Sequence, residues 1–416
     1  MTVPFNEPNS RIFWACQAVF FEERNGEGSN NGNPTGATFL DCVQAVGVSS
    51  DNPAISLLDV GRHQRQYIQY QQQTIEITIR RLLDINSNTF YKIDSYPNYK
   101  SGHILNKNNF GSDGEFLKNY DITILYTPDN FARMNAGADS SDPDKDNVIS
   151  ISYLNCIITN ISYSMSVDSV EETITLVTKN LQNNNGYSSL SSYNLPGSWL
   201  DGEPREGQIL KRQHFDLIKQ DRETVLPQEV EELFDCGGSE GVDENGNDLS
   251  IIGMQSINID VSFDYTNLMD VGIWRGSEDT KEGEQNRWQM LNLPISINCS
   301  FTGMLRQGLP YYNFLYDGGN RVRNVDNVYT KERTDGSLRK WDEADRQIKI
   351  VAQPIIDGTY FVWDLGEKNY LTSIEYTGGD AGGGNAEATI TYTNQYSDFV
   401  VMQAGTVSDI GNDGPY

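Results

Sequence analysis

Apolar and polar side chains alternate along several short stretches of this chain, and this period of two is typical of β-strands with one buried face. The clearest stretch is QTIEITIRRLL at residues 73–83, and PISINCSF at residues 294–301 repeats the pattern. We expect the apolar positions of these strands to face a core, and they are Ile75, Ile77, Ile79, Ile295, Ile297 and Cys299. The opposite face is expected to be polar and exposed, with Glu76, Thr78, Arg80, Ser296, Asn298 and Ser300.

The pattern occurs twice because the chain contains an internal repeat. Residues 43–61 and 254–272 align without a gap at a spacing of 211 (254 − 43), and both end in Asp-Val-Gly. A later match runs from Tyr153 and Tyr370 at a spacing of 217 (370 − 153). Another runs from Glu171 and Glu387 at 216 (387 − 171). A duplication on this scale indicates two copies of one module.

Both copies are expected to have the same order of strands. Ile75 is matched to Ile295 at a spacing of 220 (295 − 75), and DITILY at residues 121–126 is matched to QIKIVA at residues 347–352. Each copy then closes with a hairpin, at residues 149–168 with 170–179 in the first copy and 370–376 with 386–394 in the second. These features predict two tandem antiparallel β-sandwich or barrel modules with short helices and long loops.

The periodicity changes between the two copies. Residues 207–234 place apolar side chains among many charges and predict one or two amphipathic helices broken at Pro227. Residues 337–345, SLRKWDEAD, predict another short helix. We therefore expect three parts, namely a first β module at residues 1–195, a helical linker with an acidic loop at 196–249, and a second β module at 250–416.

Charge restricts the possible partners. The chain has 31 Lys and Arg against 58 Asp and Glu, a net charge of −27, which excludes a nucleic-acid site built on clustered cations. An acidic wall would instead repel DNA and let it pass, or would only keep the protein in solution. The N-terminal segment does not have the pattern of a secretory signal, and no apolar run reaches the roughly 18 residues of a membrane span.

The cysteines indicate that the chain is synthesised in a reducing compartment. Their number, five, is odd and their positions are scattered, so we expect reduced thiols and synthesis in the cytoplasm. Cys42, Cys156 and Cys299 lie in apolar, strand-like runs and are expected to be small core residues.

The sequence contains few motifs typical of catalysis or ligand binding. The three histidines do not have metal-ligand spacing, and nucleophile elbows, phosphate loops and dinucleotide fingerprints are absent, so we expect no enzyme activity, no catalytic residues and no cofactor. Asp142, Asp144 and Asp146 alternate as at the start of a calcium loop, but the glycine and glutamate of an EF-hand are missing. A looser calcium site there, or at residues 243–248, is left open against a solvated acidic turn.

The repeated Asp-Val-Gly motif has a simpler explanation than an acid site. An aspartate followed by a glycine after an apolar strand usually forms a turn, in which the carboxylate accepts a local backbone hydrogen bond. We expect such turns at Asp59 with Gly61 and at Asp270 with Gly272.

The order of these segments resembles that of the tail tube proteins of tailed bacteriophages. The residues that carry the resemblance are 43–48, Asp59, Gly61, 75–79 and 173–175 in the first copy, and 254–259, Asp270, Gly272, 295–299 and 389–391 in the second. In that family a small β-sandwich extends a sheet that joins those of its neighbours to line a ring. The resemblance implies a virion structural protein of the tail, assembled in the host cytoplasm.

The duplication adds an expected symmetry. If a tube ring presents six modules, as the resemblance implies, two modules per chain predict a trimer with pseudo-sixfold symmetry. Stacked trimers would form an acidic-walled channel for DNA ejection. The residues expected to face the lumen or a neighbouring ring are Glu76, Thr78, Arg80, Ser296, Asn298 and Ser300. The implied partners are other copies of the chain and the sheath, baseplate, tail terminator and tape measure proteins, with genomic DNA only in passing.

Two alternatives stay open. The chain could form a baseplate hub or a tube-initiator ring, where a trimer converts threefold into sixfold order. From another class, it could be an acidic β-protein that binds or degrades polysaccharide, although the odd cysteine count and the N-terminal sequence argue against secretion.

Overall fold

The structure is a computed structural model, and its mainly antiparallel strands confirm the predicted fold class. It describes residues 17–23, 38–51, 54–57, 67–70, 73–83, 120–126, 147–189, 209–211, 215, 224–227, 230, 234, 253–267, 289–292, 295–304, 316–317, 320–321, 323–325, 328–332, 338–340, 347–352, 360–366, 368–378, 386–394 and 400–404. The predicted module boundaries at 195/196 and 249/250 lie outside these residues.

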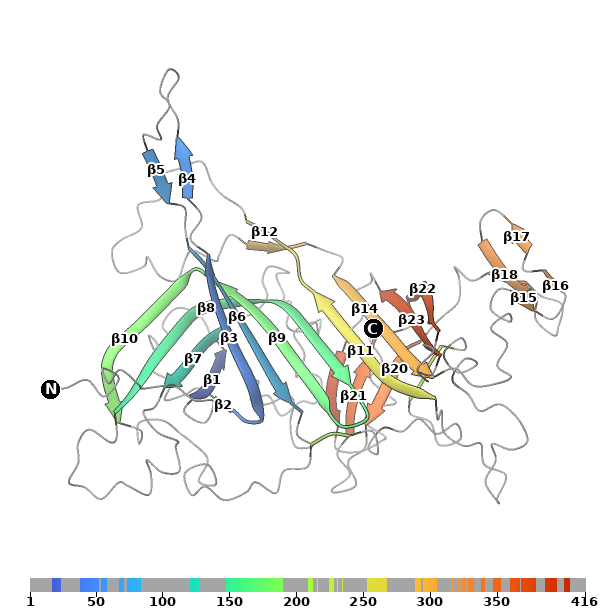
Figure 1. The fold of residues 1–416 in the computed structure, drawn as a ribbon, viewed down its shortest axis with the longest axis horizontal. Helices are drawn as coiled ribbons and strands as arrows, with labels where there is room; N and C mark the ends of the chain where they lie inside the picture. Colours follow the sequence, from blue (N-terminus) through green and yellow to red (C-terminus); the bar gives the residue numbers. More distant parts are fainter. Residues whose placement is uncertain are drawn as a thin grey trace.

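Strands of both copies form one wide, continuous sheet (Figure 1). The first copy contributes, in spatial order, β3 (Val43–Asp51), β6 (Thr74–Leu82), β9 (Val170–Thr178) and the C-terminal part of β8 (Asn147–Met165). The second copy contributes, in the same order, β11 (Met254–Ser262), β14 (Ser296–Met304), β23 (Glu387–Asn394) and β22 (Asn369–Thr377). Because β8 pairs with β11, the two copies share this sheet.

The N-terminal part of β8 continues into a second layer. There it pairs with β7 (Tyr120–Tyr126) and β10 (Asn180–Ser189), while β7 also pairs with β1 (Gln17–Glu23) and β1 with β2 (Thr38–Leu40). In the second copy, β21 (Tyr360–Asp364) pairs in the same way with β20 (Lys349–Ala352) and β24 (Val400–Ala404). The two copies therefore have matching connectivity, as the repeat predicts.

The copies differ where the chain passes between the layers. In the first copy β8 is one strand of 19 residues, with Asn155 at a φ of 60° inside it. In the second copy β21 and β22 are separate strands, and Gly366 between them has a φ of 65°. A left-handed residue bends the strand at this point, and glycine and asparagine adopt that conformation at low cost.

The remaining strands form small hairpins. They are β4 (Ala54–Leu57) with β5 (Tyr67–Tyr70), β12 (Tyr265–Asn267) with β13 (Gln289–Leu291), β15 (Tyr316–Asp317) with β16 (Asn320–Arg321), and β17 (Arg323–Val325) with β18 (Val328–Glu332) and β19 (Leu338–Lys340). The helix predicted at residues 337–345 is therefore wrong at 338–340, where pairing with β18 holds the segment extended.

The described residues of the linker include both extended and helical ones. Val225 and Phe215 form isolated antiparallel bridges to Lys349 and Ala352 of β20, so the helix predicted before Pro227 is wrong at these residues. After Pro227 the prediction is confirmed, because Val230 and Phe234 are helical and the Val230 amide donates to the Pro227 carbonyl. The linker thus adds a short extended segment to the edge of β20, as β1 does for β7.

The register of the strands corrects two of the sequence matches. Ile75 lies opposite Thr178, and Ile297 lies opposite Asn394. Since Thr178 and Asn394 are equivalent at the spacing of 216, Ile75 corresponds to Ile297 and the spacing is 222 (297 − 75), not 220. The predicted apolar face is nevertheless correct, because a shift of two residues keeps every side chain on the same face.

The second correction concerns β8 and β22. β8 has a β-bulge at Thr159 in its pairing with β9, and β22 has one at Thr372 in its pairing with β23. The two bulges lie opposite equivalent residues of the partner strands. In both bulges the threonine hydroxyl donates to a backbone carbonyl on the partner, that of Thr175 or of Thr391. The equivalent residues are thus 213 apart (372 − 159), and the match of Tyr153 to Tyr370 at 217 is wrong by four residues.

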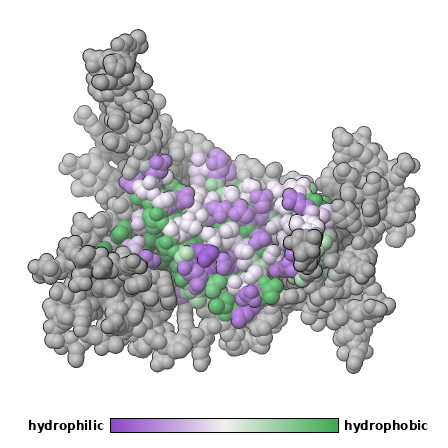
Figure 2. All heavy atoms as spheres, in the orientation of Figure 1, coloured by the Kyte–Doolittle hydropathy of each residue, from purple (hydrophilic) through white to green (hydrophobic). Residues whose placement is uncertain are grey.

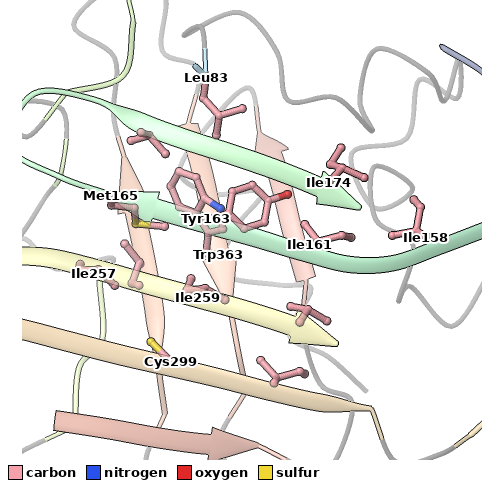
Figure 3. Close-up of a cluster of buried hydrophobic side chains, with 14 of the residues drawn as sticks. Leu83, Ile158, Ile161, Tyr163, Met165, Ile174, Ile257, Ile259, Cys299 and Trp363 are labelled. Atoms are coloured by element: carbon pink, nitrogen blue, oxygen red, sulfur yellow. The ribbon is translucent and has the colours of Figure 1, made fainter. Parts of the chain in front are cut away.

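One hydrophobic core lies between the layers and includes residues of both copies. Ile75, Ile77, Ile79, Ile295, Ile297 and Cys299 are all buried, as predicted. At the centre, Trp363 of β21 packs edge-on against Tyr163 of β8, with ring centroids 6.0 Å apart (Figure 3). A residue of the second copy therefore packs beneath a strand of the first.

Candidate assembly surface

The joint between the two copies is the pairing of β8 with β11, which we call the internal joint. Tyr163 lies opposite Ile259, and Ile161 lies opposite Val261. All four side chains are fully buried between the layers. Burying one such side chain contributes about 1.5–3 kcal/mol, so the internal joint is part of the core.

The outer, polar side of the internal joint is linked by hydrogen bonds between side chains. The Asn160 amide Nδ2 donates to Asp260 Oδ1 at 2.9 Å and to Ser262 Oγ at 3.3 Å. Ser164 Oγ donates to Asn258 Oδ1 at 2.8 Å. These contacts cross from one copy to the other, so they help to fix the register of the joint.

A buried ionic cluster lies beside the internal joint in the first copy. Tyr163 Oη donates to Glu172 Oε1 at 3.0 Å, and burial raises the pKa of this phenol well above its ordinary value. Arg81 lies between two carboxylates, with Nη1 3.6 Å from Glu172 Oε2 and Nη2 3.5 Å from Asp41 Oδ1. All three charged side chains are almost fully inaccessible, so none of them can lose a partner without a large cost.

The second copy replaces this cluster with apolar packing. Gly303 lies opposite Ala388, and Arg81 lies opposite Glu172 in the same place of the first copy. The ring of Phe234, from the linker, fills the space, since a Cβ at Gly303 would lie 2.5 Å from Phe234 Cε1. Gly303 is thus required by the close approach of the linker.

The two outer edges of the wide sheet are β3 and β22. Among the described strands, β3 pairs only with β6 and β22 only with β23. Each edge carries one of the exposed large hydrophobic residues, Val48 at 41% exposure on β3 and Tyr370 at 38% on β22. An uncovered strand edge of this kind is a template for pairing with another strand.

The predicted polar residues lie on the outer face of the wide sheet. Glu76, Arg80 and Ser296 are exposed, and Thr78, Asn298 and Ser300 are partly buried. Figure 2 shows that the side of the sheet turned to the viewer is mostly hydrophilic or near neutral. Whether this face lines a lumen or meets a neighbouring ring stays a prediction.

This outer face is rich in hydroxyl and amide groups. Thr393 Oγ1 donates to Asn298 Oδ1 at 2.8 Å, and the hydroxyls of Thr302 and Thr389 lie 3.0 Å apart. Arg80 Nη1 lies 3.9 Å from Glu171 Oε2 in an exposed ion pair, which contributes little to stability.

Several predicted features lie outside the described residues. They are the Asp-Val-Gly turns at Asp59, Gly61, Asp270 and Gly272, and the acidic loops at Asp142, Asp144, Asp146 and 243–248. Within the described ranges, no group of three His, Cys, Asp or Glu side chains could hold a metal ion. None of the described residues belongs to a helix with the length and apolar character needed to cross a bilayer.

The cysteine prediction is confirmed for two of three residues. Cys156 and Cys299 are buried and do not form disulfides, and burial raises the pKa of the Cys299 thiol above its ordinary value. Cys42 does not form a disulfide but is only partly buried, and its φ of 57° places it in the left-handed region just before β3.

The ionic cluster and the outer edges were not predicted from the sequence. Arg81 and Glu172 lie in phase with the core-facing Ile79 and Ile174, but their pairing is not evident from the sequence because the two residues are distant in it. A signal for the β3 edge was present in the repeat itself, because Gly47, Ser49 and Ser50 are smaller than their equivalents Asn258, Asp260 and Val261. Smaller side chains on one copy of a repeated strand are consistent with a different neighbour.

Comparisons with known proteins give limited information. No protein-family model and no curated protein matches the chain. A solved structure described as the cryo-EM structure of the anti-feeding prophage baseplate, 6-fold symmetrised, is similar over 40% of this chain and 90% of that chain, with 10% identity and a TM-score of 0.22. At that TM-score and identity the likeness assigns neither a fold nor a function to this chain.

Proposed function

We propose that the chain is a structural subunit of a phage tail, without catalytic activity, whose copies assemble into rings. The observation that carries the proposal is the internal joint, in which two repeats already form one continuous sheet by strand pairing. A joint of this kind is heterologous, since one edge of a module meets the opposite edge of the next, and such contacts close into rings when the rotation fits.

The number of chains in a ring follows from the duplication. With two modules per chain, a ring of six modules contains three chains, and the internal joint alternates around the circumference with joints between chains. The proposed ring is a tail tube ring that stacks axially into a channel for DNA. Its predicted partners are the sheath, baseplate, tail terminator and tape measure proteins, and its place is the virion tail.

The polar face of the wide sheet is the candidate channel wall. Its described residues are mainly hydroxyls and amides, with Glu76, Asp260 and Glu375 among the acidic side chains. Such a wall has few cations with which to bind DNA phosphates, so DNA would pass without strong attachment. Reversing charge at Glu76 should change DNA ejection and leave assembly intact, whereas a loss of assembly alone would mark the face as an interface.

Negative-stain electron microscopy of the purified protein tests the proposal. Long tubes are the expected result for a tube subunit, and isolated threefold rings would identify a baseplate hub or tube initiator. A protein that stays monomeric at all concentrations would contradict the proposal. Retention on acidic glycans, or turnover of a polysaccharide by such a monomer, would support the alternative of a polysaccharide-binding or polysaccharide-degrading protein.

A further inference from the structure

We infer that neighbouring chains join through one strand pair, β22 of one chain with β3 of the next. The register is that of β8 with β11 inside the chain. This rests on the proposed ring-forming function, and it specifies the partner strand and the register. The internal joint then serves as the template for the joint between copies, which we call the external joint.

The strands of the two joints are structurally equivalent. β3 corresponds to β11, and both have a β-bulge at the same glutamine, Gln44 in β3 and Gln255 in β11. β22 corresponds to β8, with matching bulges at Thr159 and Thr372. Bulges alter the twist of a strand and displace its register, so strands that share them present edges of the same shape.

The core-facing side chains on β3 are suited to being covered. Val46 and Val48 occupy the positions of Ile257 and Ile259. At the internal joint the two isoleucines are buried by the adjacent β8, with exposures of 4% and 0%. At the outer edge Val48 is 41% exposed. An apolar position that faces the core and stays exposed is expected where a neighbouring strand completes the sheet.

The opposite edge shows the same difference. Tyr376 of β22 corresponds to Tyr163 of β8, which is fully buried in the internal joint, whereas Tyr376 is only partly buried. Ile374 corresponds to the fully buried Ile161 but is only partly buried. Among the described strands, each outer edge therefore lacks the second partner strand that its equivalent has inside the chain, and the two edges are complementary halves of one joint.

The register of the external joint follows from that of the internal joint. Ile259 lies opposite Tyr163, and Asp260 lies opposite Ser162. The equivalent residues of the outer edges would place Val48 opposite Tyr376 on the core side. On the polar side they would place Ser49 opposite Glu375, and Asp51 opposite Ser373.

Two chains joined through the same edge, β3 with β3 or β22 with β22, agree less well with the structure. Pairing of two β3 strands or of two β22 strands would give a closed twofold dimer and would leave the other edge of each chain uncovered. Such a pairing would also have no counterpart inside the chain, because the internal joint brings two non-equivalent strands, β8 and β11, together. In a closed ring, the pairing of β22 with β3 covers both outer edges of the wide sheet of every chain.

Disulfide cross-linking of the full chain tests the register. Directly opposite residues in an antiparallel pair have Cα atoms about 4.5–5.5 Å apart, within the range of a disulfide. The variant Ser49→Cys with Glu375→Cys should therefore give, on oxidation of preformed rings, covalent species that end at three chains. The control, Ser49→Cys with Thr377→Cys, moves one cysteine by two residues on the same face, to a diagonal distance of about 7–8 Å. We expect its yield to be at least about tenfold lower.

The outcomes separate the inference from the proposed function. Rings that form without a cross-link from the first variant, or with equal yields from both, would overturn the register and leave the ring-forming function standing. Folded protein without rings under the microscope would overturn both. If the cysteine variants do not fold, Val48→Lys provides a second test, since it should reduce ring formation by at least about tenfold. Val167→Lys is its matched control, an exposed valine in the turn between β8 and β9.

Discussion

The internal joint and the outer edges of the wide sheet are built from equivalent strands, and they differ in what covers them. Ile259 in the internal joint is 0% exposed, whereas its equivalent Val48 on the outer edge is 41% exposed. The bulges and the partner strands are equivalent in both places, and apolar residues occupy two of the core-facing positions in both, although Ser50 stands where β11 has Val261. The difference therefore comes from the neighbour, β8, which the internal strand has and the outer strand lacks.

The strands next to the joint also differ between the copies. In the first copy a buried cluster of Arg81, Glu172 and Asp41 lies behind Tyr163, and in the second copy Phe234 fills the equivalent space above Gly303. Two copies with one topology thus use ionic pairing in one case and an aromatic side chain in the other. Substitutions in the two regions should therefore differ in their effects on stability and assembly.

The largest effect is expected from Glu172→Ala. The substitution removes a partner of Arg81 and of the Tyr163 hydroxyl, and the arginine stays buried without it. Breaking a buried ion pair on one side costs about 3–5 kcal/mol, so the free energy of unfolding should fall by that amount in urea titrations. Glu171→Ala, next to it on the outer face, is the matched control and should change stability by less than about 1 kcal/mol.

Truncation at the two equivalent joint positions should separate their roles. Ile259→Ala should lower the free energy of unfolding by about 2–5 kcal/mol, because the side chain is fully buried. Val48→Ala should change the stability of the isolated chain by less than about 1 kcal/mol, since surface substitutions have small effects, while it weakens ring formation. Equal losses of stability in the two variants would show that β3 is already covered within one chain.

The packing of the linker in the second copy can be tested at Gly303. A Cβ there would lie 2.5 Å from Phe234 Cε1 and 2.7 Å from the Gly253 carbonyl oxygen, so Gly303→Ala should cost about 1–3 kcal/mol. Part of this cost should disappear when Phe234→Leu is introduced as well, because the ring is then absent. Strict additivity in the double-mutant cycle would mean that Phe234 does not contact Gly303.

The smallest effect is expected from the polar side of the internal joint. Asn160→Ala removes hydrogen bonds to Asp260 and Ser262, which at a partly exposed site are worth about 0.5–1.5 kcal/mol. The equivalent change on the outer edge, Ser373→Ala, should have almost no effect on the isolated chain. Thermal unfolding followed by circular dichroism is sensitive enough to rank the two variants.

Sequence periodicity predicted the strands of the wide sheet well, and the physical reason is simple. Each strand has one face in the core, so Ile75, Ile77 and Ile79 are buried while Glu76 and Arg80 are exposed. The same property explains the errors in the matches of the repeat. A shift of two or four residues preserves the faces, so the spacings of 220 and 217 looked as good as the correct 222 and 213.

The parts that the sequence could not predict depend on distant contacts. Val225 lies in a charged segment with a helical pattern, but its amide and carbonyl bond to Lys349 and hold it extended. Leu338–Lys340 is too short for periodicity to distinguish a helix from a strand, and its pairing with β18 decides the conformation. Likewise, the alternation of Ile75, Ile77 and Ile79 places Arg81 on the core face, but the local sequence does not identify its partners Asp41 and Glu172, which are distant along the chain.

Hydrogen exchange measured on assembled rings and on isolated chains tests the claim that chains join through β22 and β3. The claim predicts that amides of Val43–Asp51 and Asn369–Thr377 become protected on assembly, while those of Met254–Ser262 are protected in both states. Amides that bond only to a neighbouring strand should gain the most protection. Rings in which both outer edges exchange as fast as in the isolated chain would contradict the claim that copies join through β22 and β3.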